Sequence, residues 1–101
     1  MSGYAVSPRA IEDLFDIWQY IAQDSEDAAN RVQSEFYEVF SALGRMPTQG
    51  HSRKDLTRKS VLFFPLYSYL IIYQPDINPI RIMAVVHGRL NVKRILKQRG
   101  L

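Results

Sequence analysis

The 101-residue sequence contains no cysteine, and this absence excludes disulfide bonds and thiolate-ligated metal sites. It also lacks a long hydrophobic run. The longest apolar stretch, residues 61–72, is interrupted by Pro65 and Ser68 and is too short to span a bilayer, so we expect no membrane partner. The first residues lack the basic start and apolar core of a signal peptide, and we therefore expect a cytoplasmic protein.

Several catalytic signatures are missing as well. There is no glycine-rich phosphate loop, no HExxH and no GxSxG, which argues against common NTPases, zinc proteases and α/β-hydrolases. We expect neither a cofactor nor a metal site. The length predicts one domain over residues 1–101, without room for a second independent core.

Acidic side chains are scarce in one part of the chain only. Residues 1–44 hold two basic and eight acidic side chains, a net charge of −6. Residues 45–101 hold eleven basic and two acidic side chains, a net charge of +9. Such a division suggests an acidic partner for the second part, either nucleic acid or an acidic protein. The alternative is that these basic side chains only keep a helical tail in solution.

Two helices are predicted in the acidic part. Ser7 is placed to cap the first helix, and Pro8 suits the first helical position. Apolar residues then recur at helical spacing: Ile11, Leu14, Phe15, Trp18 and Ile21. Polar residues fall on the other side: Glu12, Asp13, Asp16 and Gln19.

The second helix is expected to begin after Ser25, which can act as its N-cap. Its apolar stripe consists of Ala29, Val32, Phe36, Val39, Phe40 and Leu43. Gly44 is placed for a left-handed C-terminal cap. Because the connection between the helices is short, they are expected to form an antiparallel hairpin.

The periodicity changes after a cationic connector at residues 44–60. Runs rich in β-branched and aromatic residues occupy 61–64, 69–73 and 80–86, and turn residues at 65–68 and 75–79 separate them. This pattern predicts a three-stranded antiparallel meander with 69–73 in the middle. Tyr4–Val6 is a candidate N-terminal strand, and 92–98 a candidate short helix. The expected fold class is α+β: N-terminal strand, two-helix hairpin, meander and short C-terminal helix.

Two groups of residues are candidates for chemistry. The acidic run of Glu12, Asp13 and Asp16 could bind a metal, but no histidine accompanies it, and a solvated helix surface is the preferred interpretation. His87 ends the last predicted strand and could transfer a proton near neutral pH.

Together with cations, His87 could assist attack of an RNA 2′-hydroxyl on the adjacent phosphate. Arg58, Lys59, Arg81 and Arg89 could then stabilise the developing negative charge. The simpler interpretation is a structural histidine that bonds a backbone group at the strand end.

The order of these elements resembles the RelE/ParE toxin superfamily over nearly the whole chain. The residues that carry the resemblance lie in four places: Ser7–Leu14 with Ile17, Tyr20 and Ile21; Pro47 and Gly50 with Arg53; Tyr69–Tyr73; and Val85–Arg89 leading into a basic helix. The His87-Gly88-Arg89 ending and the helical tail are similar to ParE. The run 61–64 carries no cation, and no tyrosine follows Arg89, which departs from the RNase branch.

The resemblance implies the toxin of a type II toxin–antitoxin pair that inhibits DNA gyrase by binding it, not by catalysis. It implies neutralisation by a cognate antitoxin, small, acidic and ParD-like, through which alone operator DNA is contacted. Target or antitoxin contacts are then expected at Arg81, His87, Arg89, Lys93, Arg94 and Lys97. The alternative is a ribosome-dependent mRNA endoribonuclease of the RelE type, with His87, Arg81 and Arg58 as its catalytic residues.

Overall fold

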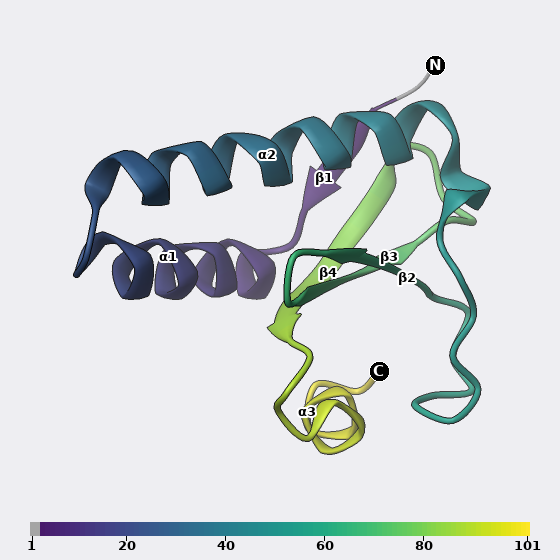
Figure 1. The fold of residues 1–101 in the computed structure, drawn as a ribbon. Helices are drawn as coiled ribbons and strands as arrows, with labels where there is room; N and C mark the ends of the chain where they lie inside the picture. The colour runs from purple at the N-terminus through teal and green to yellow at the C-terminus, as the bar shows by residue number, and fades with distance from the viewer. Residues whose placement is uncertain (1–2) are drawn as a thin grey trace.

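The computed structural model describes residues 3–101. It confirms the predicted α+β fold (Figure 1). The elements in chain order are β1 (Tyr4–Val6), α1 (Pro8–Ala22), α2 (Glu26–Arg45), a 3-10 turn (Pro47–Gln49), β2 (Leu62–Leu66), β3 (Tyr69–Gln74), β4 (Ile80–His87) and α3 (Val92–Gln98). Within residues 3–101, no helix combines the length and the hydrophobicity needed to cross a membrane.

The four strands form one sheet in the order β1-β4-β3-β2. The meander β2–β3–β4 is antiparallel, as predicted, whereas β1 pairs in parallel with β4. The register places Tyr69 opposite His87 at one end of the meander and Gln74 opposite Arg81 at the other. A register shift next to Tyr73 leaves Met83 as an extra residue of β4, and this bulge changes which side chains of β4 face each side of the sheet.

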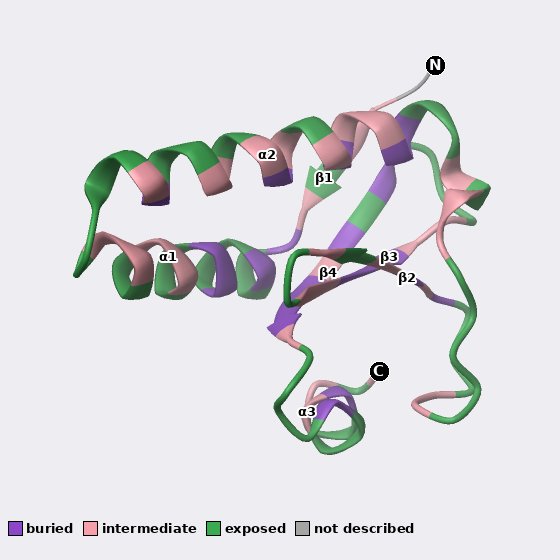
Figure 2. Ribbon diagram, viewed as in Figure 1, coloured by how far each residue is buried: buried purple, intermediate pink, exposed green. Residues whose placement is uncertain are grey.

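The sheet has two covered faces. The hairpin of α1 and α2 packs on one of them, which we call the hairpin face, and α3 lies on the other, the α3 face (Figures 1 and 2). The hairpin-face core consists of Ala10, Leu14, Phe36, Phe40, Leu43, Ile71, Tyr73, Ile80, Ile82 and Val85. The α3-face core consists of Val61, Phe63, Ile72, Ala84, Val86, Val92 and Leu96. The predicted place of residues 69–73 in the middle of the meander is confirmed, because β3 lies between β2 and β4.

Both predicted helix caps are present. The Ser7 hydroxyl accepts from the N–H of Ala10 at 3.1 Å, and the Ser25 hydroxyl accepts from the N–H of Ala28 at 3.1 Å. The predicted end of the second helix is wrong, because Gly44 is helical and α2 continues to Arg45. A glycine is needed at this position for another reason. A Cβ on Gly44 would lie 2.6 Å from the carbonyl oxygen of Gly3, so close packing of α2 on the β1 segment excludes a side chain.

The apolar side of α1 also differs from the prediction. Ile11 and Phe15 are 53% and 56% exposed, whereas Ala10 and Leu14 are buried in the hairpin-face core. The actual inward direction passes through Ala10, Leu14 and Ile17, which lie three or four residues apart. The apolar pattern is wider than the contact surface, and the sequence alone does not show which part of it faces the sheet.

The turn between β2 and β3 is shorter than expected. Pro65 and Leu66 continue β2 and pair with Leu70 and Tyr69. Pro65 is tolerated because β2 is an edge strand. On its outer side there is no strand that would need the N–H that proline lacks. Tyr67 turns the chain with a φ of 55°, and its hydroxyl bonds the Glu35 carboxylate of α2. This bond raises the Tyr67 pKa and fixes the turn to the hairpin.

The long connector between α2 and β2 is fixed to the sheet at two points. The Tyr73 hydroxyl donates to the Pro47 carbonyl at 2.7 Å and accepts from the Gly50 N–H at 2.9 Å. Burial raises the pKa of the Tyr73 phenol. His51 exchanges two backbone hydrogen bonds of 2.8 Å with Phe63. These contacts bring residues 52–60 to the α3 face.

Candidate functional site

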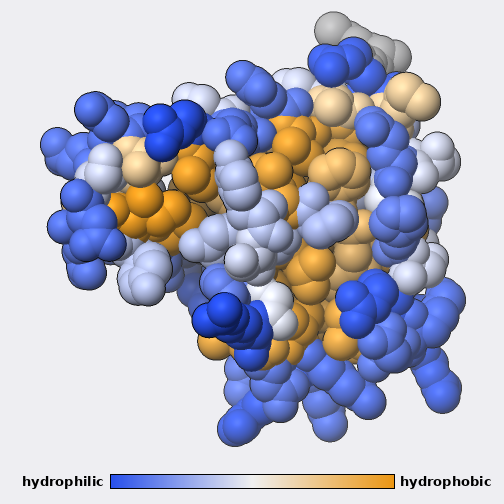
Figure 3. All heavy atoms as spheres, viewed as in Figure 1, coloured by the Kyte–Doolittle hydropathy of each residue, from blue (hydrophilic) through white to orange (hydrophobic). Residues whose placement is uncertain are grey.

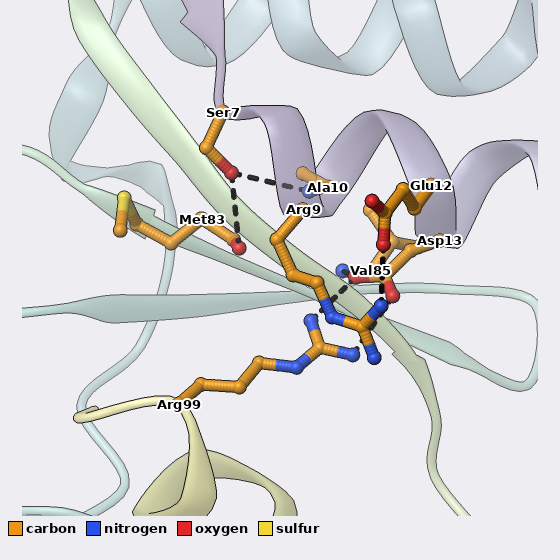
Figure 4. Close-up of polar contacts among 8 residues, drawn as sticks. All are labelled: Ser7, Arg9, Ala10, Glu12, Asp13, Met83, Val85 and Arg99. Atoms are coloured by element: carbon orange, nitrogen blue, oxygen red, sulfur yellow. Dashed lines mark hydrogen bonds and ion pairs between the residues drawn. The ribbon is translucent and has the colours of Figure 1, made fainter.

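One edge of β4 is covered by side chains rather than by a strand. The short β1 pairs only with Ile80–Ile82, so the rest of this edge has no strand partner. The Ser7 hydroxyl donates to the Met83 carbonyl at 3.3 Å, and the Val85 N–H donates to the Asp13 carboxylate at 3.0 Å (Figure 4). The first turns of α1 therefore satisfy backbone groups of β4 that a longer β1 would otherwise pair with.

Asp13 also holds the end of the chain's last helix. Its two carboxylate oxygens accept from the Arg99 guanidinium at 2.7 and 2.8 Å, in a bidentate arrangement (Figure 4). The side chains are only 7% and 16% exposed for Asp13 and Arg99, so this ion pair is largely removed from water. The preferred interpretation of the acidic run as a solvated surface is wrong for Asp13, although Glu12 and Asp16 are exposed.

The burial of Asp13 could have been predicted from its position on α1, although it is not an apolar residue. Asp13 lies three residues after Ala10 and four before Ile17, so it shares the inward side of α1 with them. A carboxylate there requires a buried donor or cation. No local pattern in the sequence shows that Arg99, 86 positions away, supplies it.

His87 lies in a cleft of about 670 Å³ between α1, the end of β4 and α3, which we call the His87 cleft. Its ring packs edge-on against Tyr69, with centroids 5.3 Å apart. The Nδ1 atom accepts the backbone N–H of Arg89 at 3.0 Å, as expected for the structural interpretation of this histidine. This bond occupies the Nδ1 lone pair and holds the ring in place at the end of β4.

The three residues of the ribonuclease alternative do not come together. Arg81 and His87 lie at opposite ends of β4, about 20 Å apart at roughly 3.3 Å per residue. They also point to opposite sides of the sheet, because Ile80 and Ile82 next to Arg81 face the hairpin and the bulge turns His87 to that same face. Arg58 lies on the α3 face, at the edge of a different cleft.

The second cleft runs between α3 and residues 56–59 and has a volume of about 520 Å³. We call it the basic groove. It is lined by four cationic side chains and four other residues: Arg58, Lys59, Lys93, Lys97, Leu56, Thr57, Gly100 and Leu101. The structure therefore brings together four residues named from the sequence, Arg58, Lys59, Lys93 and Lys97. Leu56 and Leu101, which form its apolar floor, could not be identified from charge patterning.

The remaining predicted contact residues lie outside this groove. Arg89 and Arg94 are exposed on the turn after β4 and on α3, and Arg81 is exposed at the far end of β4. Three ion pairs occur within residues 3–101: Arg9–Glu12, Arg53–Asp55 and Arg99–Asp13. None of the groove cations takes part in them. Over the same residues, no group of three or more histidine or acidic side chains is arranged to hold a metal ion.

The architecture matches that of proteins of known structure. Ten chains of known structure match, among them one described as "Chromosomal ParDE TA system from P. aeruginosa". It matches with a TM-score of 0.71, covering 86% of this chain and 96% of that chain, at 18% sequence identity. At this identity the likeness establishes the fold. No curated protein sequence matches the chain.

The family follows from the sequence itself. A family model described as "ParE toxin of type II toxin-antitoxin system, parDE" matches residues 4–92. The match covers most of the chain, and the chain therefore belongs to the ParE toxin family of type II toxin–antitoxin systems. The resemblance drawn from the motifs is confirmed. Because the match ends at residue 92, Arg99 and most of the basic groove's α3 wall lie beyond it.

Proposed function

We propose that this toxin inhibits DNA gyrase by binding it, without catalysis, and that a cognate ParD-like antitoxin neutralises it. The observation that carries the proposal is the exposed set of cations on α3, which the buried Asp13–Arg99 pair fixes to the rest of the molecule. The separation of His87, Arg81 and Arg58 supports binding over ribonuclease chemistry. Gyrase as the target would place the toxin in the cytoplasm.

The partner assignment rests on family membership and on charge. The solved relative is described as a ParDE system, in which a ParE toxin is named together with ParD. An acidic antitoxin complements the +9 charge of residues 45–101. We propose that operator DNA is contacted through the antitoxin in such a complex.

A supercoiling assay tests the target. Purified gyrase is incubated with relaxed plasmid, ATP and an excess of toxin, and both supercoiled product and trapped cleaved DNA are measured. We expect inhibition and trapped cleavage complexes. Normal supercoiling without trapped breaks at toxin excess contradicts the proposal.

Charge variants assign the contact surface. We expect Lys93→Ala/Arg94→Ala/Lys97→Ala on α3 to weaken inhibition at least tenfold. The matched control is Arg31→Ala/Arg45→Ala/Lys54→Ala, which removes three exposed cations elsewhere and leaves the net charge equal. Equal loss in both triple variants means that net charge, not α3, determines inhibition.

The ribonuclease alternative has one observation in its favour. His87 and Tyr69 pack against one another in the His87 cleft, so an imidazole and a phenol, both able to transfer protons, lie close together. Toeprinting of translated mRNA tests it. Cleavage that disappears in His87→Ala supports this alternative, and intact mRNA at toxin excess eliminates it.

A further inference from the structure

We propose that the basic groove is a docking site for an acidic, amphipathic peptide segment that places an apolar side chain on the floor formed by Leu56 and Leu101. The proposal rests on the proposed function for the source of the segment, which we take to be the antitoxin. The binding chemistry itself follows from the groove.

Charge is the first argument. Four cations line the groove, two from residues 58–59 and two from α3. Lys93 and Lys97 are four residues apart and therefore lie on the same side of α3, toward the connector. The charge of Asp55 couples to Lys93, but this carboxylate is already bonded to Arg53 at 2.8 and 3.0 Å. Uncompensated cations attract an anionic ligand and speed its approach.

The apolar floor of the groove favours a peptide over nucleic acid as the ligand. Leu56 and Leu101 are half-buried and pack against the α3-face core, leaving apolar surface at the base of the groove. A phosphate backbone has no apolar group to cover such a floor. None of the eight lining residues is aromatic, so bases would find no stacking surface. A peptide that alternates acidic and apolar side chains can pair its carboxylates with the cations of the walls and pack its apolar side chains on the floor.

The walls of the groove are joined before any ligand arrives. The Thr57 hydroxyl donates to the Leu101 carbonyl and accepts from the Lys59 N–H at 3.1 Å. One residue thus connects the connector wall to the end of α3. On the other side of α3, Arg99 is held by Asp13. Because both walls are fixed, binding costs little ordering of the toxin itself.

The test uses the full-length toxin and a defined probe. The probe is a fluorescein-labelled ten-residue peptide of eight acidic residues and two leucines, and binding is followed by fluorescence anisotropy. We expect saturable binding whose dissociation constant rises at least tenfold in Lys93→Gln/Lys97→Gln. Arg31→Gln/Arg45→Gln is the matched control: it removes two exposed cations that lie outside the groove and outside the proposed contact surface, and we expect less than a threefold change.

The apolar anchor is tested in the probe, so the fold of the toxin stays unchanged. Replacing both leucines by serine keeps the charge, and we expect at least a fivefold weaker complex. Equal affinity for both peptides contradicts the role of the floor. Absence of peptide binding, or equal weakening by the two toxin variants, overturns the docking site. Groove-dependent binding of a labelled 16-base-pair DNA duplex in place of the peptide overturns it as well.

The same variants are assayed against gyrase, which separates the two proposals. If wild-type toxin binds the peptide through the groove but leaves gyrase active, the docking site stands and the gyrase proposal fails. If gyrase is inhibited and the peptide does not bind, the reverse holds.

Discussion

The two faces of the sheet differ in the length of their helices, the size of their cores and the charge of their outer surfaces. The hairpin face is covered by helices of 15 and 20 residues over ten buried core residues, and its outer surface belongs to the acidic part of the chain. The α3 face is covered by a helix of seven residues over seven buried core residues. The outside of that helix is hydrophilic (Figure 3), and its Lys93, Arg94 and Lys97 are exposed. The larger face provides most of the apolar burial, and the smaller face carries the cations that we assign to partners.

This difference shows how a helix as short as α3 can present a binding surface. Seven residues are too few for a helix to be stable alone, so α3 depends on contacts with the rest of the molecule. Apolar packing of Val92 and Leu96 supplies one part, and the ion pair of Arg99 with Asp13 supplies another. Asp13, a residue of the helical hairpin, therefore stabilises the helix on the opposite face of the sheet.

The largest effect is expected in the hairpin face. Phe40 is fully buried and packs edge-on against Tyr4 and Tyr37, with ring centroids 5.6 and 5.5 Å apart. Phe40→Ala leaves a cavity, and we expect the free energy of unfolding to fall by about 3–5 kcal/mol, measured by urea unfolding. A loss below about 1 kcal/mol contradicts a dominant role for this core.

Removing the carboxylate of Asp13 tests the link between the faces. Asp13→Ala leaves the Val85 N–H and the Arg99 guanidinium without their buried acceptor, and we expect a loss of about 3 kcal/mol. Faster amide exchange in α3 is expected as well. Glu12→Ala is the control, because this neighbouring carboxylate is exposed, and it is expected to leave stability nearly unchanged. Similar losses of stability in both variants contradict a larger contribution from the buried ion pair than from an exposed carboxylate.

A third change asks whether α3 can open by itself. Leu96 is fully buried in the smaller core, and we expect Leu96→Ala to destabilise α3 by about 2–3 kcal/mol. Hydrogen exchange should show faster exchange in residues 92–98 than in α2. If amides of both helices accelerate equally, the two faces unfold as one unit.

The smallest effects are expected at the helix caps. Ser7→Ala removes a cap and also the bond to Met83, whereas Ser25→Ala removes an exposed cap alone. We expect losses of about 1–2 and about 1 kcal/mol, respectively, by thermal unfolding. A larger loss for Ser25→Ala contradicts a role for Ser7 in covering the edge of β4.

Local rules predicted much of the fold and little of the connection between its faces. The caps at Ser7 and Ser25, the stripe of α2, the meander and residues 92–98 as a helix follow from spacing and turn chemistry, and the structure confirms them. The parallel pairing of β1 and the helical position of Gly44 depend on which segments approach each other in space. Local patterns do not contain that information.

The candidate site shows the same limit. The charge division predicted a basic surface, and the basic groove joins Lys93 and Lys97 with Arg58. The apolar floor was not predicted, because Leu56 and Leu101 are isolated hydrophobic residues in polar segments. Asp13 was assigned to the solvent because its partner is distant in sequence, and the bulge that places Arg81 and His87 on opposite faces has no local signal.

The ion pair of Asp13 and Arg99 can form only after residue 99 has been made. The two residues lie 86 positions apart, so their contact closes a loop that spans most of the chain, and contacts of this kind form slowly. During translation, residue 99 is added after the hairpin and all four strands have been made. A ribosome-bound chain that ends before Arg99 therefore lacks the ion pair that links α3 to α1, and its α3 depends on the apolar packing of Val92 and Leu96 alone.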